Sequence, residues 1–261
     1  PMIYYPLATL MLAKIKDILI ISSTEYIEAF RSLLGDGSRI GINIQYSVQD
    51  KPEGIAQAFH IGESFIGEDS VCLMLGDNFL YGHMLPDILI SQKKKIENSG
   101  GASIFGYNVL NPSDYGVATV DGDRVLSIEE KPKNPKSNWA VIGLYMYDNT
   151  VKKVSREIKP SDRNELEITS VNNEYLKNDC LSISLLGRGY TWFDTGNSED
   201  LFTASSFVRT IEKRQGLKIA CLEEIAYYMG YITREHLQRC ANSLKNTEYG
   251  NYLNNLIEKE D

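Results

Sequence analysis

Two aspartates, Asp77 and Asp194, each follow a run of apolar residues and have a glycine within two positions. Residues 71–75 suit a buried β-strand, and the carboxyl ends of such strands line ligand crevices in open α/β sheets. If both aspartates end strands at one sheet edge, they could share a magnesium ion, which accepts oxygen ligands and substrate phosphates. Asn78, directly after Asp77, is a further candidate for substrate binding. The competing interpretation is two unrelated aspartates in turns, where this residue is common.

A charged run closed by proline, residues 129–132, could supply groups for a phosphorylated sugar. Lys131 could meet a phosphate as a mobile point charge, and Glu130 could accept hydrogen bonds from sugar hydroxyls. The alternative is a solvated charge cluster, which is the usual meaning of such a run.

Loop and strand positions near glycines add candidates for ligand contact. Tyr115 and Gly116 in one loop, and Val141 in a predicted strand, are expected to face a sugar, because glycine lets a ligand approach the backbone. Gln49 lies between a predicted strand and a predicted helix, so it could pair with a base edge while the Gly54 amide supports it. Each of these signals is weak alone, since turn glycines and core aromatics are common.

Apolar segments of strand length alternate with segments of helical character along most of the chain, which is typical of a doubly wound sheet. Residues 117–129 predict a β-hairpin whose turn contains Gly122, and such a hairpin would make the sheet mixed. We expect an α/β fold of Rossmann-like type, with a mixed, mostly parallel sheet flanked by helices. No repeat or evident linker divides the chain, so one domain over residues 1–261 is expected, with a C-terminal helical segment from about residue 198.

Composition limits the classes of partner. The formal net charge of −8 argues against nucleic acid and acidic membrane surfaces, because anionic partners would be repelled on average. No stretch approaches eighteen uninterrupted apolar residues and no secretory signal opens the sequence, so we expect a cytoplasmic protein. The 4 cysteines and 3 histidines show no metal-ligand spacing.

Short stretches spread over nearly the whole chain carry a specific resemblance. They are residues 1–7, 34–38, 57–59, 61–67, 75–78, 81–83, 115–117, 129–132, 135–138, 165–169, 187–190, 194–196, 214–218 and 223–226. In this order they resemble the sugar-1-phosphate nucleotidylyltransferases, most closely those that are glucose-1-phosphate thymidylyltransferases. The resemblance implies the nucleotide-diphospho-sugar transferase type of fold.

The resemblance also implies roles for the residues named above. Asp77 and Asp194 would bind Mg²⁺, and together with Lys131 they would be the catalytic residues. The other implied roles are thymine recognition by Gln49 and Gly54, glucose contacts by Tyr115, Gly116, Glu130 and Val141, and binding of the sugar phosphate by Lys131.

The implied reaction joins dTTP and glucose 1-phosphate to give dTDP-glucose and pyrophosphate, the first step of dTDP-rhamnose or other deoxysugar synthesis. Positioning and charge neutralisation supply most of the rate in such chemistry. The family also implies a homotetramer and feedback inhibition by dTDP-rhamnose.

One departure from the family leaves alternatives open. Members begin with a strand and a glycine-rich G-G-x-G-T-R-L loop followed by a lysine, and these would precede Pro1. The sequence therefore predicts an N-terminally truncated chain in which the residues closest to the reacting phosphorus cannot be named. A non-catalytic sugar-nucleotide-binding or regulatory homologue is one alternative. An enzyme that uses another base, such as UTP, is the second.

Overall fold

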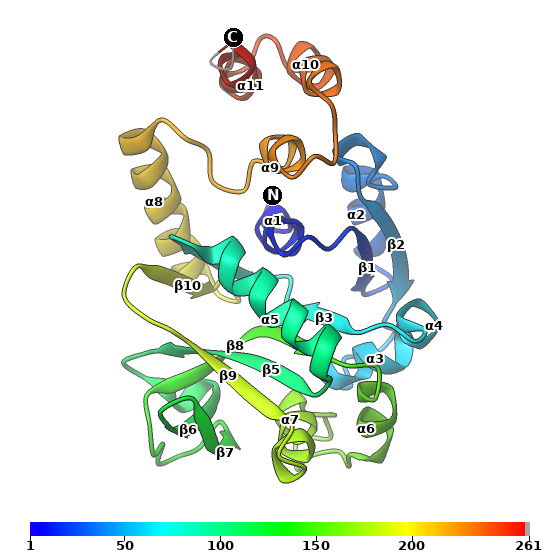
Figure 1. The fold of residues 1–261 in the computed structure, drawn as a ribbon, viewed down its shortest axis with the longest axis vertical. Coiled ribbons are helices and arrows are strands. Elements are labelled where there is room, and N and C mark those ends of the chain that lie inside the picture. Colours follow the sequence, from blue (N-terminus) through cyan, green and yellow to red (C-terminus); the bar gives the residue numbers. More distant parts are fainter. Residues whose placement is uncertain (259–261) are drawn as a thin grey trace.

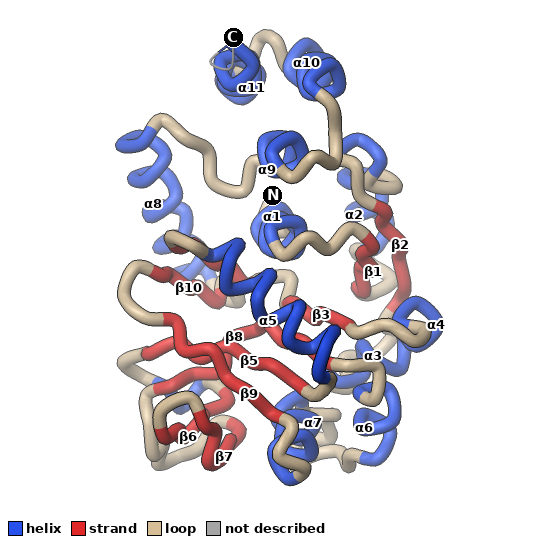
Figure 2. Tube along the Cα trace, in the orientation of Figure 1, coloured by secondary structure: helices blue, strands red, loops and turns tan. Residues whose placement is uncertain are grey.

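The computed structural model describes residues 1–258, in which helices and strands follow one another along the whole chain (Figure 1, Figure 2). The helices are α1 (Tyr4–Leu12), α2 (Ile27–Leu34), α3 (Ala58–Ile61), α4 (Glu63–Ile66), α5 (Leu85–Ser99), α6 (Val151–Glu157), α7 (Ile168–Lys177), α8 (Ser198–Gln215), α9 (Leu222–Tyr228), α10 (Arg234–Ser243) and α11 (Glu248–Glu258), with 3₁₀ turns η1 (Ser38–Ile40), η2 (Ile55–Gln57) and η3 (Pro112–Asp114). The strands are β1 (Asp17–Ser22), β2 (Asn43–Val48), β3 (Val71–Met74), β4 (Asn78–Gly82), β5 (Ala102–Asn108), β6 (Gly116–Asp121), β7 (Arg124–Glu130), β8 (Trp139–Tyr147), β9 (Leu181–Leu186) and β10 (Tyr190–Asp194).

Six strands form one sheet in the order β7-β6-β8-β5-β9, with β3 also paired to β8. β8 runs antiparallel to β3, β5 and β6, and β6 runs antiparallel to β7, whereas β5 and β9 are parallel. Two further pairs are the parallel β1 and β2 and the antiparallel β4 and β10.

The expected mixed sheet is confirmed, but the prediction that it is mostly parallel is wrong. Parallel neighbours need a long crossover connection, whereas antiparallel neighbours can be joined by a short turn. β6 and β7 are joined by such a turn, in which Gly122 has a φ of +58°. The strand β8 then returns without an intervening helix and lies antiparallel to three neighbours.

β8 lies inside the sheet and sends its side chains alternately into two cores. Tyr145 and Tyr147 face the core that includes residues of α3, α6 and α7. Leu144 and Met146 face the core under α5, which crosses the sheet in Figure 1. Because both faces of β8 are packed, the strand gives a rigid base for the residues along it.

A separate core joins the N-terminal and C-terminal helices. Met11 of α1, Leu237 of α10 and Leu253 of α11 are fully buried in it, and α9 packs on α1. From Ser198 to Glu258 the chain forms the four helices α8 to α11. Along residues 1–258, no helix combines the length and apolar character that a membrane span requires.

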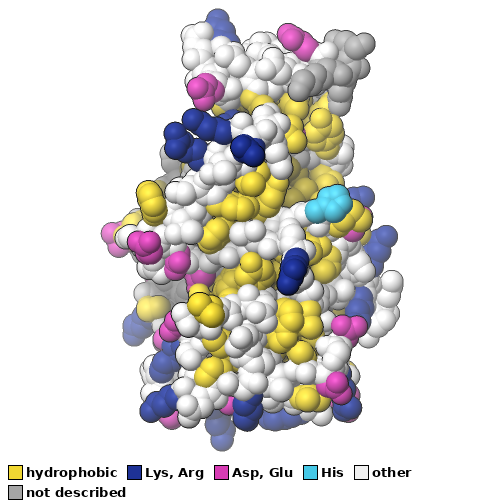
Figure 3. All heavy atoms as spheres, turned by 90° about the vertical axis from the view of Figure 1, so that its left-hand side faces the viewer, with side chains coloured by type: hydrophobic (Ala, Val, Ile, Leu, Met, Phe, Trp, Pro, Cys, Tyr) yellow, Lys and Arg dark blue, Asp and Glu magenta, His cyan; other side chains and the backbone are white. Residues whose placement is uncertain are grey.

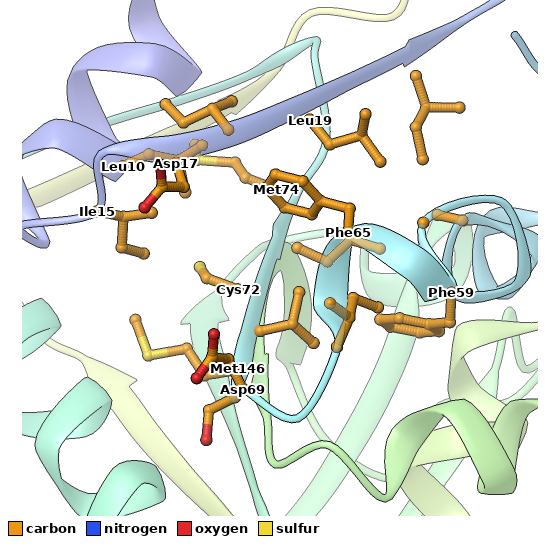
Figure 4. Close-up of a pocket in the computed structure, with 18 of the residues that line it drawn as sticks. Leu10, Ile15, Asp17, Leu19, Phe59, Phe65, Asp69, Cys72, Met74 and Met146 are labelled. Atoms are coloured by element: carbon orange, nitrogen blue, oxygen red, sulfur yellow. The ribbon is translucent and has the colours of Figure 1, made fainter. Parts of the chain in front are cut away.

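A cavity of about 770 Å³ lies between β1 and β3 (Figure 4). Its walls include Leu19 of β1, Cys72 and Met74 of β3, and the aromatic side chains of Phe59 and Phe65. The strand predicted over residues 71–75 is present, but its residues are partly exposed because they line this cavity. Its side chains nevertheless pack on both faces, Val71 and Leu73 against one core and Cys72 and Met74 against the other. The predicted cover on both faces is therefore present, although no residue of β3 is fully buried.

Candidate active site

The carboxylates of Asp77 and Asp194 come together because the turn after β3 leads into β4, which pairs with β10. In this pairing Asn78, the first residue of β4, lies opposite Asp194, the last residue of β10. The Asp77 carbonyl accepts hydrogen bonds from the amide and the hydroxyl of Thr195, at 3.0 and 2.7 Å. Asp77 Oδ2 and Asp194 Oδ1 lie 3.6 and 3.5 Å from one point, the position that a Cβ on Gly196 would occupy. The two carboxylates therefore face one small space.

The electrostatics of this pair favour a cation. Burial raises the pKa of Asp194, and the negative charge of Asp77 raises it further, while Lys131 acts in the opposite direction. A divalent cation between the carboxylates would relieve their repulsion, and carboxylate oxygens are ligands that Mg²⁺ prefers. Within residues 1–258, no group of three or more His, Cys, Asp or Glu side chains could hold a metal. A cation at this pair would thus depend on water and substrate oxygens for its other ligands.

A cavity of about 390 Å³ adjoins the aspartate pair and gathers most of the residues predicted from the sequence. Its volume lies in the range usual for small-molecule sites. Predicted residues on its wall are Gln49, Gly54, Asn78, Tyr115, Gly116, Glu130, Lys131, Val141 and Asp194. Segments that are far apart in the sequence therefore meet around one cavity.

Gly116 lies where three other side chains of the cavity wall converge. It is the first residue of β6 and is paired with Glu130, the last residue of β7. A Cβ at Gly116 would lie 3.1 Å from Thr169 Oγ1, 3.4 Å from Glu130 Oε2 and 3.9 Å from Val141 Cβ. The Thr169 hydroxyl donates a hydrogen bond to Glu130 Oε2. A carboxylate, a hydroxyl and an apolar face around an open glycine suit recognition of a sugar ring and its hydroxyls.

Lys131 holds an unusual backbone conformation at the edge of the cavity. Its φ is +41°, a region that residues other than glycine seldom adopt, and its amide donates to the Tyr115 carbonyl at 3.0 Å. The residue is exposed, and its charge is close enough to Asp194 to lower the pKa of that carboxyl in part. The conformation thus places a mobile cation between the sugar side of the cavity and the aspartate pair.

Gln49 and Gly54 lie at another wall of the cavity. Gln49 Nε2 donates to Gln57 Oε1 at 2.5 Å, and Gln57 Nε2 donates to Glu53 Oε2 at 2.7 Å. This chain of bonds sets the orientation of the Gln49 amide. Gly54 has a φ of +103°, and its backbone lies against the backbone of Leu166.

Among the wall residues that were not candidates from the sequence, three could contact a ligand through a charged, hydroxyl or indole group. Arg163 and Thr169 come from the segment before α7 and from α7 itself, and Trp192 comes from β10. Arg163 pairs with Glu167 at 2.8 Å, which holds a guanidinium at the cavity. Of the three, only Thr169 lies in a stretch that carried the resemblance, residues 165–169, and that stretch gave no roles. Asn78, which was predicted to contact substrate, is 1% exposed, and its side-chain nitrogen donates to Asp77 Oδ1 at 2.9 Å.

Comparison with known proteins gives consistent matches over most of the chain. The sequence model of the family described as nucleotidyl transferase matches residues 1–211. A glucose-1-phosphate thymidylyltransferase of Neisseria meningitidis is 50% identical over 260 residues, which are 99% of this chain and 89% of the relative.

Solved structures give the same result for the fold. A crystal structure of a candidate glucose-1-phosphate thymidylyltransferase from Bacillus anthracis, in complex with sucrose, is 38% identical. It matches with a TM-score of 0.72 over 80% of this chain and 82% of that chain. A UDP-glucose pyrophosphorylase complexed with UDP-glucose matches with a TM-score of 0.66 over 81% of this chain and 87% of that one; at 20% identity, this likeness concerns the fold alone. The chain is an enzyme of the nucleotidyl transferase family and belongs to its glucose-1-phosphate thymidylyltransferase branch.

Proposed function

We propose that this protein transfers the thymidylyl group of dTTP to glucose 1-phosphate, giving dTDP-glucose and pyrophosphate. The observation that carries the proposal is the convergence of Asp77 and Asp194 beside a cavity whose wall is suited to bind a sugar ring. The 50% identity to an enzyme named for this reaction supports the choice of substrates.

In the proposed reaction, an oxygen of the glucose 1-phosphate phosphate group forms a bond to the α-phosphorus of dTTP. The bond between the α-phosphorus and the oxygen that joins it to the β-phosphorus breaks, and pyrophosphate leaves with the electron pair of that bond. Asp77 and Asp194 would hold a divalent cation, for which we propose Mg²⁺; when bound, such a cation offsets the charge of the triphosphate. Lys131 neutralises the attacking phosphate, and Glu130 and Gly116 hold the glucose ring in line.

Release of pyrophosphate tests the proposal directly. We expect release to require both dTTP and glucose 1-phosphate, and to be faster with dTTP than with UTP at equal concentration. Faster release with UTP would reassign the base preference. A folded protein that binds dTDP-glucose but releases no pyrophosphate would be a sugar-nucleotide-binding homologue, and the proposed activity would be wrong.

Lys131→Ala should mainly weaken the use of glucose 1-phosphate. Loss of a charge-assisted hydrogen bond to phosphate costs about 1.5–3 kcal/mol, so the KM for glucose 1-phosphate should rise roughly 10- to 100-fold. Initial rates over a range of glucose 1-phosphate at saturating dTTP measure this change. Lys136→Ala is the matched control. Lys136 is exposed and pairs with Glu129 of β7, the strand that ends directly before Lys131. Equal KM values for the two variants would remove Lys131 from the phosphate site.

We also propose a homotetramer in the cytoplasm that serves dTDP-rhamnose or other deoxysugar synthesis and is inhibited by dTDP-rhamnose. Support for assembly comes from the surface that carries α8, where hydrophobic side chains are gathered (Figure 3). On α8 itself, Leu201 is 46% exposed and Phe202 is 70% exposed, and these adjacent apolar side chains add to a surface that a partner could cover. Light scattering after size exclusion gives the mass, and a monomer at micromolar concentration would contradict the assembly.

A further inference from the structure

Asn78 is a buried amide at the point where three strands meet. It is 1% exposed, it begins β4, and its side chain reaches both β8 and β10. Asn78 Oδ1 accepts hydrogen bonds from the Trp192 indole Nε1 at 2.7 Å and from the Gly143 amide at 3.0 Å. Both lone-pair directions of this oxygen are thus used, which fixes the plane of the amide.

With its oxygen fixed in this way, the amide can present its nitrogen in one direction only. Asn78 Nδ2 donates to Asp77 Oδ1 at 2.9 Å. The other oxygen, Asp77 Oδ2, is the one that lies near Gly196 and faces the same space as Asp194 Oδ1. One carboxylate oxygen is therefore held by Asn78 while the other is directed toward the second aspartate.

Gly143 makes this arrangement possible. A Cβ at Gly143 would lie 2.6 Å from Asn78 Oδ1 and 2.7 Å from Leu75 Cδ1, distances too short for a Cβ atom unless these groups shift. A glycine is thus needed on β8 for the Asn78 amide to reach the strand. A side chain at this position would push Asn78, Leu75 or both out of place.

We propose that Asn78 is a positioning residue that orients the Asp77 carboxylate for a divalent cation, rather than a residue that binds substrate. The inference rests on the proposed function, because it assumes that Asp77 and Asp194 hold the cation. Residues that hydrogen bond to metal ligands typically contribute 10- to 100-fold to metal affinity. Asn78 has the geometry for such a contribution: it is buried, its amide oxygen is held by two donors, and its nitrogen bonds to Asp77 Oδ1 and leaves Oδ2 near Asp194 Oδ1.

Binding of Mn²⁺ to the full chain, followed by electron paramagnetic resonance without substrates, tests the inference independently of turnover. We expect Asn78→Ala to raise the Kd for Mn²⁺ about 10- to 100-fold. Asn172→Ala is the matched control, because Asn172 is also fully buried and its Oδ1 also accepts from an aromatic side chain, the Tyr147 hydroxyl at 2.6 Å. It should lose stability but keep its Mn²⁺ affinity within about twofold, since it bonds to no metal-site carboxylate.

Two further variants keep the result interpretable. If Asn78→Ala does not fold, Gly143→Ala provides the second test, because its methyl group would overlap Asn78 Oδ1, 2.6 Å away. It should weaken Mn²⁺ binding in the same way. Asp77→Asn separates the two proposals. If Asp77→Asn binds Mn²⁺ as tightly as the wild type does, the proposed metal site is wrong. If Asp77→Asn weakens Mn²⁺ binding, but a folded Asn78→Ala or Gly143→Ala variant has a Kd for Mn²⁺ within twofold of the wild-type value, the positioning role is wrong.

Discussion

Replacing Asp77 or Asp194 with asparagine is expected to lower kcat for pyrophosphate release roughly a thousandfold, which corresponds to about 4 kcal/mol of lost transition-state stabilisation. Each substitution keeps the size of the side chain but removes one of the two charges that converge near Gly196. The triphosphate would then enter a site that cannot hold its cation, and the charge that develops during transfer would remain uncompensated. Initial rates at saturating substrates and a range of Mg²⁺ concentrations measure the effect.

Asp200→Asn is the control for this prediction. Asp200 belongs to the first turn of α8 and is close enough to Asp194 to raise the pKa of Asp194. Asp200→Asn therefore also removes one negative charge near the candidate metal site. The Asp200 carboxylate accepts a hydrogen bond from Asn197, and it is not among the atoms within 4 Å of the Gly196 Cβ position where the two aspartates converge. We expect a loss of less than tenfold. Equal losses for Asp194→Asn and Asp200→Asn would mean that net charge matters there and that no metal is bound by Asp194.

Loss of folding must also be excluded as the cause of low activity. Because burial and Asp77 raise the pKa of Asp194 above its value in the unfolded chain, its ionisation at neutral pH lowers the stability of the folded state. Asparagine removes that cost. Without divalent cations, Asp194→Asn should therefore have a Tm at pH 7 no lower than wild type. The difference should disappear at a pH below about 3.9, where the unfolded carboxyl is protonated as well.

The candidate metal ligands could be predicted from the sequence because each follows an apolar run and adjoins a glycine. What the sequence could not supply was the reason that they meet. The strand β4 starts directly after Asp77 and lacks an alternation of apolar and polar residues, so no pattern separates it from the turn. Its antiparallel pairing with β10 depends on contacts more than 100 positions apart, which single-sequence periodicity does not encode.

The same limit explains the wrong sheet direction and the overlooked wall residues. Alternating strands and helices favoured parallel pairing, yet the loops into β7 and β8 are too short for crossover helices. Arg163 reaches the cavity through a loop, where no periodicity marks the direction of a side chain. Burial of Asn78 also could not be predicted, because asparagine after a strand is an ordinary turn residue. Local patterns thus identified the chemistry, whereas long-range packing determined the geometry.

Gly54→Ala is expected to disturb both stability and dTTP binding. Gly54 has a φ of +103° and a ψ of 163°, a region open almost only to glycine, and a Cβ there would lie 2.5 Å from both the nitrogen and the oxygen of Leu166. These backbone atoms cannot yield easily, since Leu166 is bonded to the carbonyl of Glu53 at 2.7 Å and to the amide of Ala56 at 3.1 Å. We expect a loss of at least about 2 kcal/mol in the free energy of unfolding.

The functional part of this prediction follows from the position of Gln49, which shares the cavity wall with Gly54. Moving the loop should raise the KM for dTTP more than the KM for glucose 1-phosphate, because Glu130 and Gly116 lie on other strands. Gly67→Ala is the matched control: Gly67 also has a positive φ, +54°, but a Cβ there would meet no atom within 4 Å. It should show backbone strain without a clash and leave the KM for dTTP unchanged. If both variants bind dTTP like the wild type, Gly54 and its loop do not recognise the base.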